Sequence, residues 1–144
     1  MAEGTVRLSR KVTLFFSVYE EVGHGASCGL PEDTEDLLVV DMGCVGEGLS
    51  CREQQVSICA KDSSGPYDYE MTGELIALAK SNGIDYAVDV YPAYGSDAAA
   101  ALRAGRDVRF ALIGAGVYAS HGYERSHRKG VENTLRLIEA VVTA

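Results

Sequence analysis

The chain has 144 residues, of which 47% are hydrophobic, and its 21 acidic and 13 basic side chains give a formal net charge of −8. This length and composition fit one globular domain with a buried core. The acidic balance provides no basic patch for phosphate or anionic lipid, which excludes nucleic acid and membrane surfaces from the expected partners.

The sequence also contains no apolar run that approaches the thickness of a bilayer, and its first residues lack the pattern of a secretion signal. We therefore expect a cytoplasmic protein. The cysteines are Cys28, Cys44, Cys51 and Cys59, and no two of them have the C-x2-C or C-x4-C spacing of a metal site. Disulfides and zinc binding are both conceivable, but in a chain without a signal we expect reduced cysteines with a structural role.

Two apolar runs in the first third of the chain predict strands that end at acidic residues. Residues 1–10 are polar and are expected to be a leader or a cut end. Residues 12–19 are rich in β-branched and aromatic side chains, which predicts a strand covered on both faces and ending at Glu20. A glycine-rich loop follows at 23–31, and residues 37–40 predict a short buried strand that stops at Asp41.

The remaining elements alternate between strands and helices. Loops are expected at residues 43–50 and 114–130. Strands are expected at residues 55–60, 84–90 and 108–113, and helices at residues 67–80, 98–102 and 131–142. The first helix should stop at Asn82-Gly83, and Asp97 should cap the second. This alternation predicts an α/β fold with a mixed, partly parallel sheet.

Chemically useful side chains gather where the predicted strands end. In open sheets of this kind, sites lie beyond the carboxyl ends of the strands, where Glu20, Glu21, Asp41 and the loop after Ile113 are placed. That loop contains His121 and His127. Carboxylates beside a neutral imidazole are a ligand set for zinc, cobalt or manganese. Taken singly, each of these residues is also compatible with an ordinary solvated position, as is His24.

A glycine pattern at residues 114–119 superficially fits a dinucleotide-binding fingerprint. That motif must open a helix directly and be followed about 20 residues later by an acid that ends a second strand. Gly122 and Gly130 interrupt any such helix, and too little chain remains for the second strand. We therefore reject a dinucleotide site and expect these glycines to let the backbone turn tightly over the site.

An ordered set of motifs resembles the C-terminal part of the glutamyl aminopeptidase and cellulase M family, which includes the tetrahedral aminopeptidases. The resemblance covers the chain from about Lys11 to its end. The matching motifs are Glu20-Glu21-Val22-Gly23 with Gly25-Ala26, Val39-Val40-Asp41, Gly95-Ser96-Asp97-Ala98, and Tyr118-Ala119-Ser120-His121 with Glu124.

The resemblance implies a three-layer α/β/α sandwich in which two divalent metal ions activate a water that attacks an N-terminal peptide bond. Zinc or cobalt is the expected metal, and manganese is an alternative. Glu20 matches the catalytic general base. Glu21 and His121 match ligands of one metal and Asp41 a ligand of the other, with His127 as an alternative to His121. Ser96 and Asp97 match a segment with a structural or substrate-positioning role.

The chain also departs from the family pattern. A histidine two residues from an aspartate, and an aspartate that bridges both metals, should precede residue 11, where residues 1–10 contain neither residue type. Residues 11–144 are therefore expected to be the C-terminal part of a metallopeptidase-like catalytic domain, with weak metal binding and little activity alone. Expected partners are a peptide substrate and either further copies of the chain or the missing N-terminal portion. The alternatives are a non-catalytic α/β module that binds a partner or small ligand, and a related hydrolase of sugars or amides.

Overall fold

The computed structural model describes residues 7–144, so residues 1–6 of the expected leader lie outside the described part. Within this part, six strands form one mixed sheet. Its main path is β1 (Asp36–Val45), β5 (Arg109–Tyr118), β2 (Val56–Asp62) and β3 (Gly65–Pro66). β4 (Tyr86–Val90) pairs with β2, and the short β6 (Arg125–Ser126) pairs with β5. β5 runs parallel to β1 and antiparallel to β2, which confirms a mixed, partly parallel sheet.

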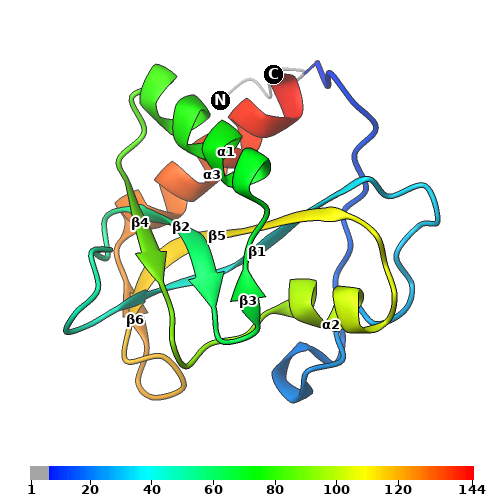
Figure 1. Cartoon of the computed structure of the whole chain (residues 1–144). Coiled ribbons are helices and arrows are strands. Elements are labelled where there is room, and N and C mark those ends of the chain that lie inside the picture. The colour runs from blue at the N-terminus through cyan, green and yellow to red at the C-terminus, as the bar shows by residue number, and fades with distance from the viewer. Residues whose placement is uncertain (1–6) are drawn as a thin grey trace.

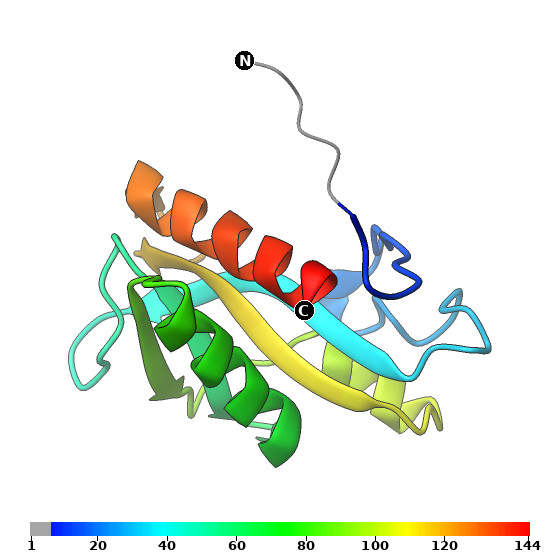
Figure 2. The same cartoon turned by 90° about the horizontal axis from the view of Figure 1, so that it is seen from above.

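Helices cover both faces of this sheet. Figures 1 and 2 show α1 (Tyr69–Ser81) and α3 (Arg128–Thr143) together on one face and α2 (Asp97–Arg103) on the other. The predicted three-layer α/β/α arrangement is therefore confirmed. No helix in the described part has the length and apolar character needed to cross a bilayer.

The core on the two-helix side follows from the spacing of apolar residues. Met71, Leu75 and Ala79 recur at intervals of four along α1, so they share one face, and all three are buried. They pack with Ile58 of β2 and Leu137 of α3 in one cluster. Asp68 caps α1 by accepting a hydrogen bond from the Met71 N–H at 2.7 Å.

A smaller apolar cluster lies on the face that α2 covers. Tyr67, Tyr91 and Leu112 are buried there with Ala98 of α2. All four cysteines are free: Cys51 and Cys59 are buried, Cys44 is half-buried and Cys28 is exposed. Burial raises the pKa of the Cys51 and Cys59 thiols to about 12. These two therefore behave as the structural cysteines that the sequence predicts.

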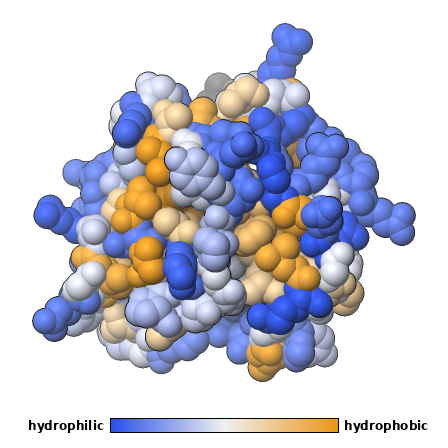
Figure 3. All heavy atoms as spheres, in the orientation of Figure 1, coloured by the Kyte–Doolittle hydropathy of each residue, from blue (hydrophilic) through white to orange (hydrophobic). Residues whose placement is uncertain are grey.

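The predicted strand at residues 12–19 is wrong. This segment has no strand assignment, and Leu14 and Phe16 are 78% and 87% exposed. A run of β-forming residues becomes a strand only by pairing with a neighbour, and among residues 7–144 β1 pairs with β5 alone. In the described part of the chain, the outer edge of β1 is consequently open. β4 forms the opposite edge, where Val88 and Val90 are exposed. Figure 3 shows apolar patches between hydrophilic residues on this side of the molecule.

Other boundaries also differ from the prediction. β1 continues to Val45, so Asp41 lies inside the strand and residues 43–45 are not loop. The predicted loop at 114–130 is wrong at its start, because Gly114 and Gly116 belong to β5. A Cβ at Gly114 would lie 2.3 Å from the Asp41 carbonyl oxygen, so this glycine allows close approach between strands. The N-cap of α2 is Ser96 rather than Asp97.

Candidate active site

Five of the predicted site residues line one cleft of about 840 Å³. The 3₁₀ helix η1 (Glu20–Val22) contributes Glu20 and Glu21, β1 contributes Asp41, and the loop before α2 contributes Ser96. The turn that follows β5 contributes His121. In Figure 1, η1 lies beside α2 on the same side of the sheet. Residues that are 101 positions apart in sequence, Glu20 and His121, thus line the same cavity.

Glu21 and His121 are near neighbours at the mouth of the cleft. Glu21 Oε2 lies 3.5 Å from His121 Nε2, and both side chains are largely exposed to solvent. The turn that carries the imidazole has an unusual backbone conformation, since His121 has φ 61° and Ala119 has φ 58°. The His121 N–H donates to Glu124 Oε1 at 2.9 Å. This local bond fixes the turn that carries the imidazole.

Glu20 has the electrostatic surroundings of a proton carrier. Partial burial raises the pKa of its carboxyl group, and the negative charges of Asp41, Asp97 and Glu21 raise it further. A carboxyl group with a raised pKa accepts and releases a proton more readily near neutral pH than an ordinary glutamate does. Glu21, the next residue of η1, is exposed to solvent.

Asp97 lies behind the cleft rather than in its lining. It is buried against Gly25, where an added Cβ would meet the Asp97 carboxylate at 1.9 Å, so only glycine fits there. Within residues 7–144, Asp97 Oδ1 has no hydrogen-bond partner. A buried carboxylate oxygen without a donor, whose charge also raises the pKa of Glu20, indicates a region that favours a cation.

The donor set suits a divalent metal ion only in part. Carboxylates and one imidazole are the ligands that zinc and similar ions take. Yet among residues 7–144 no three such side chains are arranged to hold an ion together. His127 does not line the cleft; its Nδ1 accepts a hydrogen bond from the Lys129 N–H at 3.0 Å and so caps α3.

Sequence reasoning missed several residues of the cleft. Tyr94 lines it and donates from its hydroxyl to the Met42 carbonyl oxygen at 3.2 Å. Burial, followed by the charge of Asp41, raises the pKa of Tyr94. Arg103 of α2 and the half-buried Cys44 of β1 also line the cleft. The only advance signal was proximity in sequence, since Tyr94 lies two residues before Ser96.

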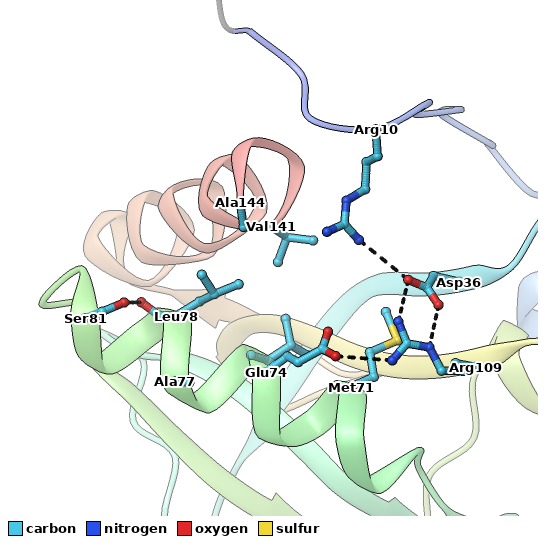
Figure 4. Close-up of a pocket in the computed structure, with 11 residues that line it drawn as sticks. Arg10, Asp36, Met71, Glu74, Ala77, Leu78, Ser81, Arg109, Val141 and Ala144 are labelled. Atoms are coloured by element: carbon cyan, nitrogen blue, oxygen red, sulfur yellow. Dashed lines mark hydrogen bonds and ion pairs between the residues drawn. The ribbon is translucent and has the colours of Figure 1, made fainter.

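A second hollow of about 540 Å³ lies between α1, α3 and the N-terminal segment. Figure 4 shows Arg10 and Arg109 turned toward Asp36, with Glu74 on the other side of Arg109. The two Arg109–Asp36 hydrogen bonds are 2.8 and 2.9 Å long. Apolar residues of α1 and Val141 of α3 make up much of the remaining wall, and no predicted site residue lies here. The cleft at η1 is therefore the candidate active site.

Comparison with family models identifies the class of protein to which this fold belongs. A model of the M42 glutamyl aminopeptidase family matches residues 3–137, so the chain belongs to this family.

Individual relatives agree with this assignment. The putative aminopeptidase YhfE of Bacillus subtilis (strain 168) is 46% identical over 119 residues, which make up 83% of this chain and 34% of the relative. The chain thus spans about a third of the length of this curated relative.

The solved structures of similar fold include two archaeal peptidases. The Pyrococcus horikoshii TET1 peptidase, which can assemble into a tetrahedron or a large octahedral shell, superposes with a TM-score of 0.76 at 24% identity. That match covers 88% of this chain and 39% of the other. The aminopeptidase APDkam598 from Desulfurococcus kamchatkensis gives a TM-score of 0.79 at 20% identity, with the same two coverages. At these identities the structural likeness establishes the fold alone.

Proposed function

We propose that this chain contributes part of the active site of a metal-dependent aminopeptidase that removes N-terminal residues from peptides. The observation that supports this function best is the convergence of Glu20, Glu21, Asp41 and His121 on one cleft. Membership of an aminopeptidase family gives that convergence its chemical meaning.

In this proposal each side chain has a separate task. Glu20 takes a proton from the attacking water and returns it to the leaving amine, a role that suits its raised pKa. Glu21 and His121 would hold one divalent ion and Asp41 a second, with zinc or cobalt as the expected metal. Such ions, when bound, polarise the scissile carbonyl and acidify water. Ser96, which lines the cleft, positions the substrate, and Asp97, buried behind it, has a structural role.

The ligand set within this chain is incomplete. One ion would retain Glu21 and His121, and the other would retain Asp41 alone. A carboxylate that bridges two ions both neutralises charge and sets their spacing, and among residues 7–144 no group of three candidate ligands is arranged to hold an ion. We therefore infer weak binding of one ion and little or no peptidase turnover by the 144-residue chain on its own.

The open edge of β1 and the segment beside it indicate where a partner would bind. The unpaired segment at residues 12–18 and the free strand edge together present apolar side chains and backbone groups that proteins normally cover. We infer that this surface takes up either another copy of the chain or the remaining portion of a longer catalytic domain.

Calorimetric titration with zinc and with cobalt tests the function. We expect one weak site that Glu21→Ala abolishes, whereas Glu139→Ala, which removes an exposed acid on α3, leaves it intact. Hydrolysis of leucine p-nitroanilide should be absent or marginal. Strong turnover by this chain would contradict the inferred incompleteness. The absence of binding at any pH would favour the non-catalytic module instead.

A further inference from the structure

The hydroxyl of Ser96 does not make the hydrogen bond that is usual for an N-cap side chain. Ser96 is the N-cap of α2, with φ −147° and ψ 173°, yet its side chain makes no capping hydrogen bond. An N-cap serine ordinarily accepts a hydrogen bond from a backbone N–H of its own helix. Here Ser96 Oγ instead lies 2.7 Å from the hydroxyl of Tyr67. Ser96 also lines the cleft.

A buried carboxylate determines the direction of this hydrogen-bond chain. Asp62, at the end of β2, is 2% exposed. Its Oδ1 accepts from the Ser64 N–H at 2.7 Å, and its Oδ2 accepts from the Tyr67 hydroxyl at 2.8 Å. In Figure 1 the ends of β2 and β3 lie beside the start of α2, which brings these residues together.

The polarity of Ser96 follows from counting hydrogens. A carboxylate only accepts hydrogen bonds, and a phenol has one hydrogen to give. Because the Tyr67 hydrogen points to Asp62, Ser96 must donate its own hydrogen to the Tyr67 oxygen. Burial raises the pKa of Tyr67, so the phenol stays protonated. Ser96 Oγ is left with lone pairs only and is therefore an acceptor.

We propose that Asp62 and Tyr67 are positioning residues that fix Ser96 Oγ as a hydrogen-bond acceptor for the free α-ammonium group of a peptide. The acids that line the same cleft, Glu20 and Glu21 among them, favour the same positive charge. This assignment rests on the proposed aminopeptidase function and adds the residues that recognise the amino terminus.

Binding of leucinamide to the 144-residue chain tests the assignment. Its neutral analogue N-acetyl-leucinamide has no ammonium group and is the matched ligand. Nuclear magnetic resonance titrations with a chelator present, followed at the backbone amides of Gly95 and Asp97, measure both affinities without any metal ion. We expect a clear preference for leucinamide. Ser96→Ala should lower the leucinamide affinity about tenfold, the loss typical of a hydrogen bond to a charged group.

Substitutions of two tyrosines distinguish a positioning role of Tyr67 from a merely structural one. Tyr67→Phe frees the Ser96 hydrogen and should weaken leucinamide binding with little change for the acetylated analogue. Tyr91→Phe is the control, because Tyr91 is as buried as Tyr67 and its hydroxyl pairs with Ser57 instead. It should leave leucinamide binding unchanged. Ser96→Thr keeps the hydroxyl and should restore the preference that Ser96→Ala removes.

The results that would overturn this assignment differ from those that would overturn the proposed aminopeptidase function. The assignment is overturned if the parent chain does not prefer leucinamide, or if Tyr67→Phe and Tyr91→Phe weaken binding equally. It is also overturned if Ser96→Ala binds both ligands like the parent. None of these results depends on metal binding, which the zinc and cobalt titrations test separately.

Discussion

Glu20 and Glu21 lie on a segment, residues 7–35, that is held very differently from the sheet that carries Asp41. The segment contains one turn of 3₁₀ helix and is attached mainly by isolated contacts, such as the Ser9 N–H to the Val142 carbonyl oxygen at 3.0 Å. Asp41 is fixed instead by the ten-residue pairing of β1 with β5. One half of the candidate site is thus built on a ladder of backbone bonds and the other on an unpaired chain.

The difference shows what a strand-forming sequence needs. Residues 12–19 have stronger β-forming composition than β1, yet only β1 has a neighbouring strand in this chain. Placement of the Glu20-Glu21 pair therefore depends on what lies against the segment. We expect the geometry of this half to tighten when a partner covers it.

A matched pair of leucine substitutions gives the largest expected contrast between the two regions. Leu137 of α3 is fully buried in the core, whereas Leu14 is 78% exposed. Leu137→Ala should lower the free energy of unfolding by about 2–5 kcal/mol because it leaves a cavity. Leu14→Ala should change it by less than about 0.5 kcal/mol. Urea denaturation measures both, and equal losses would show that the segment is packed after all.

Substitution of Gly114 tests whether the strand pairing holds Asp41 in place. Gly114→Ala would bring a Cβ against the Asp41 carbonyl oxygen, so we expect a loss of about 1–3 kcal/mol in the free energy of unfolding. Gly73→Ala is the control, because Gly73 is exposed within α1 and has open space around it. That change should stabilise the chain by up to about 1 kcal/mol. Tolerance of alanine at position 114 would refute the close approach.

Self-association through the unpaired segment is the third expected effect. The parent chain should form larger species as its concentration rises, and sedimentation velocity detects them. The double substitution Leu14→Lys and Phe16→Lys should weaken this association about tenfold by placing charges on the surface. Val131→Lys removes an exposed apolar residue on α3 and should have no effect. A parent chain that stays monomeric at all concentrations would exclude another copy of the chain as the occupant of this surface.

The smallest effect concerns an exposed ion pair within the segment. Lys11 Nζ lies 2.6 Å from Asp33 Oδ2, and its hydrogen bond and charge lower the pKa of Asp33. This contribution to stability is present above the unfolded pKa of about 3.9 and is lost as the pH falls through the lower folded value. Asp33→Asn should therefore slightly lower the melting temperature at neutral pH and have no effect in strong acid. High salt should shrink the difference, and a difference independent of pH would exclude this ion pair as its cause.

Elements with a complete local pattern were predictable from the sequence. The spacing of Met71, Leu75 and Ala79 and the Asn82-Gly83 stop placed α1 within two residues of its observed bounds. Local pattern failed where pairing or close approach decides the structure. Residues 12–19 lack a partner strand, and Gly114 suggested a loop although its missing side chain serves a tight pairing.

The candidate site was predictable as a set of residues, and the resemblance to a known family guided their selection. Glu20, Glu21, Asp41, Ser96 and His121 line one cleft, while the roles assigned to them stay predictions. Asp62 and Tyr67 were not foreseen, because nothing in a sequence reports which hydroxyl donates to which oxygen. Such direction appears only when buried donors and acceptors are placed together.

The free thiols of the two regions should react with labelling reagents at very different rates. Cys28, on the N-terminal segment, is exposed and should react first with a maleimide dye. Cys51 and Cys59 are buried, with pKa values raised to about 12, so they should react only when the sheet itself opens. A dye on Cys28 would then report the docking of a partner against the segment. Labelling of the other two would report the lifetime of the folded state.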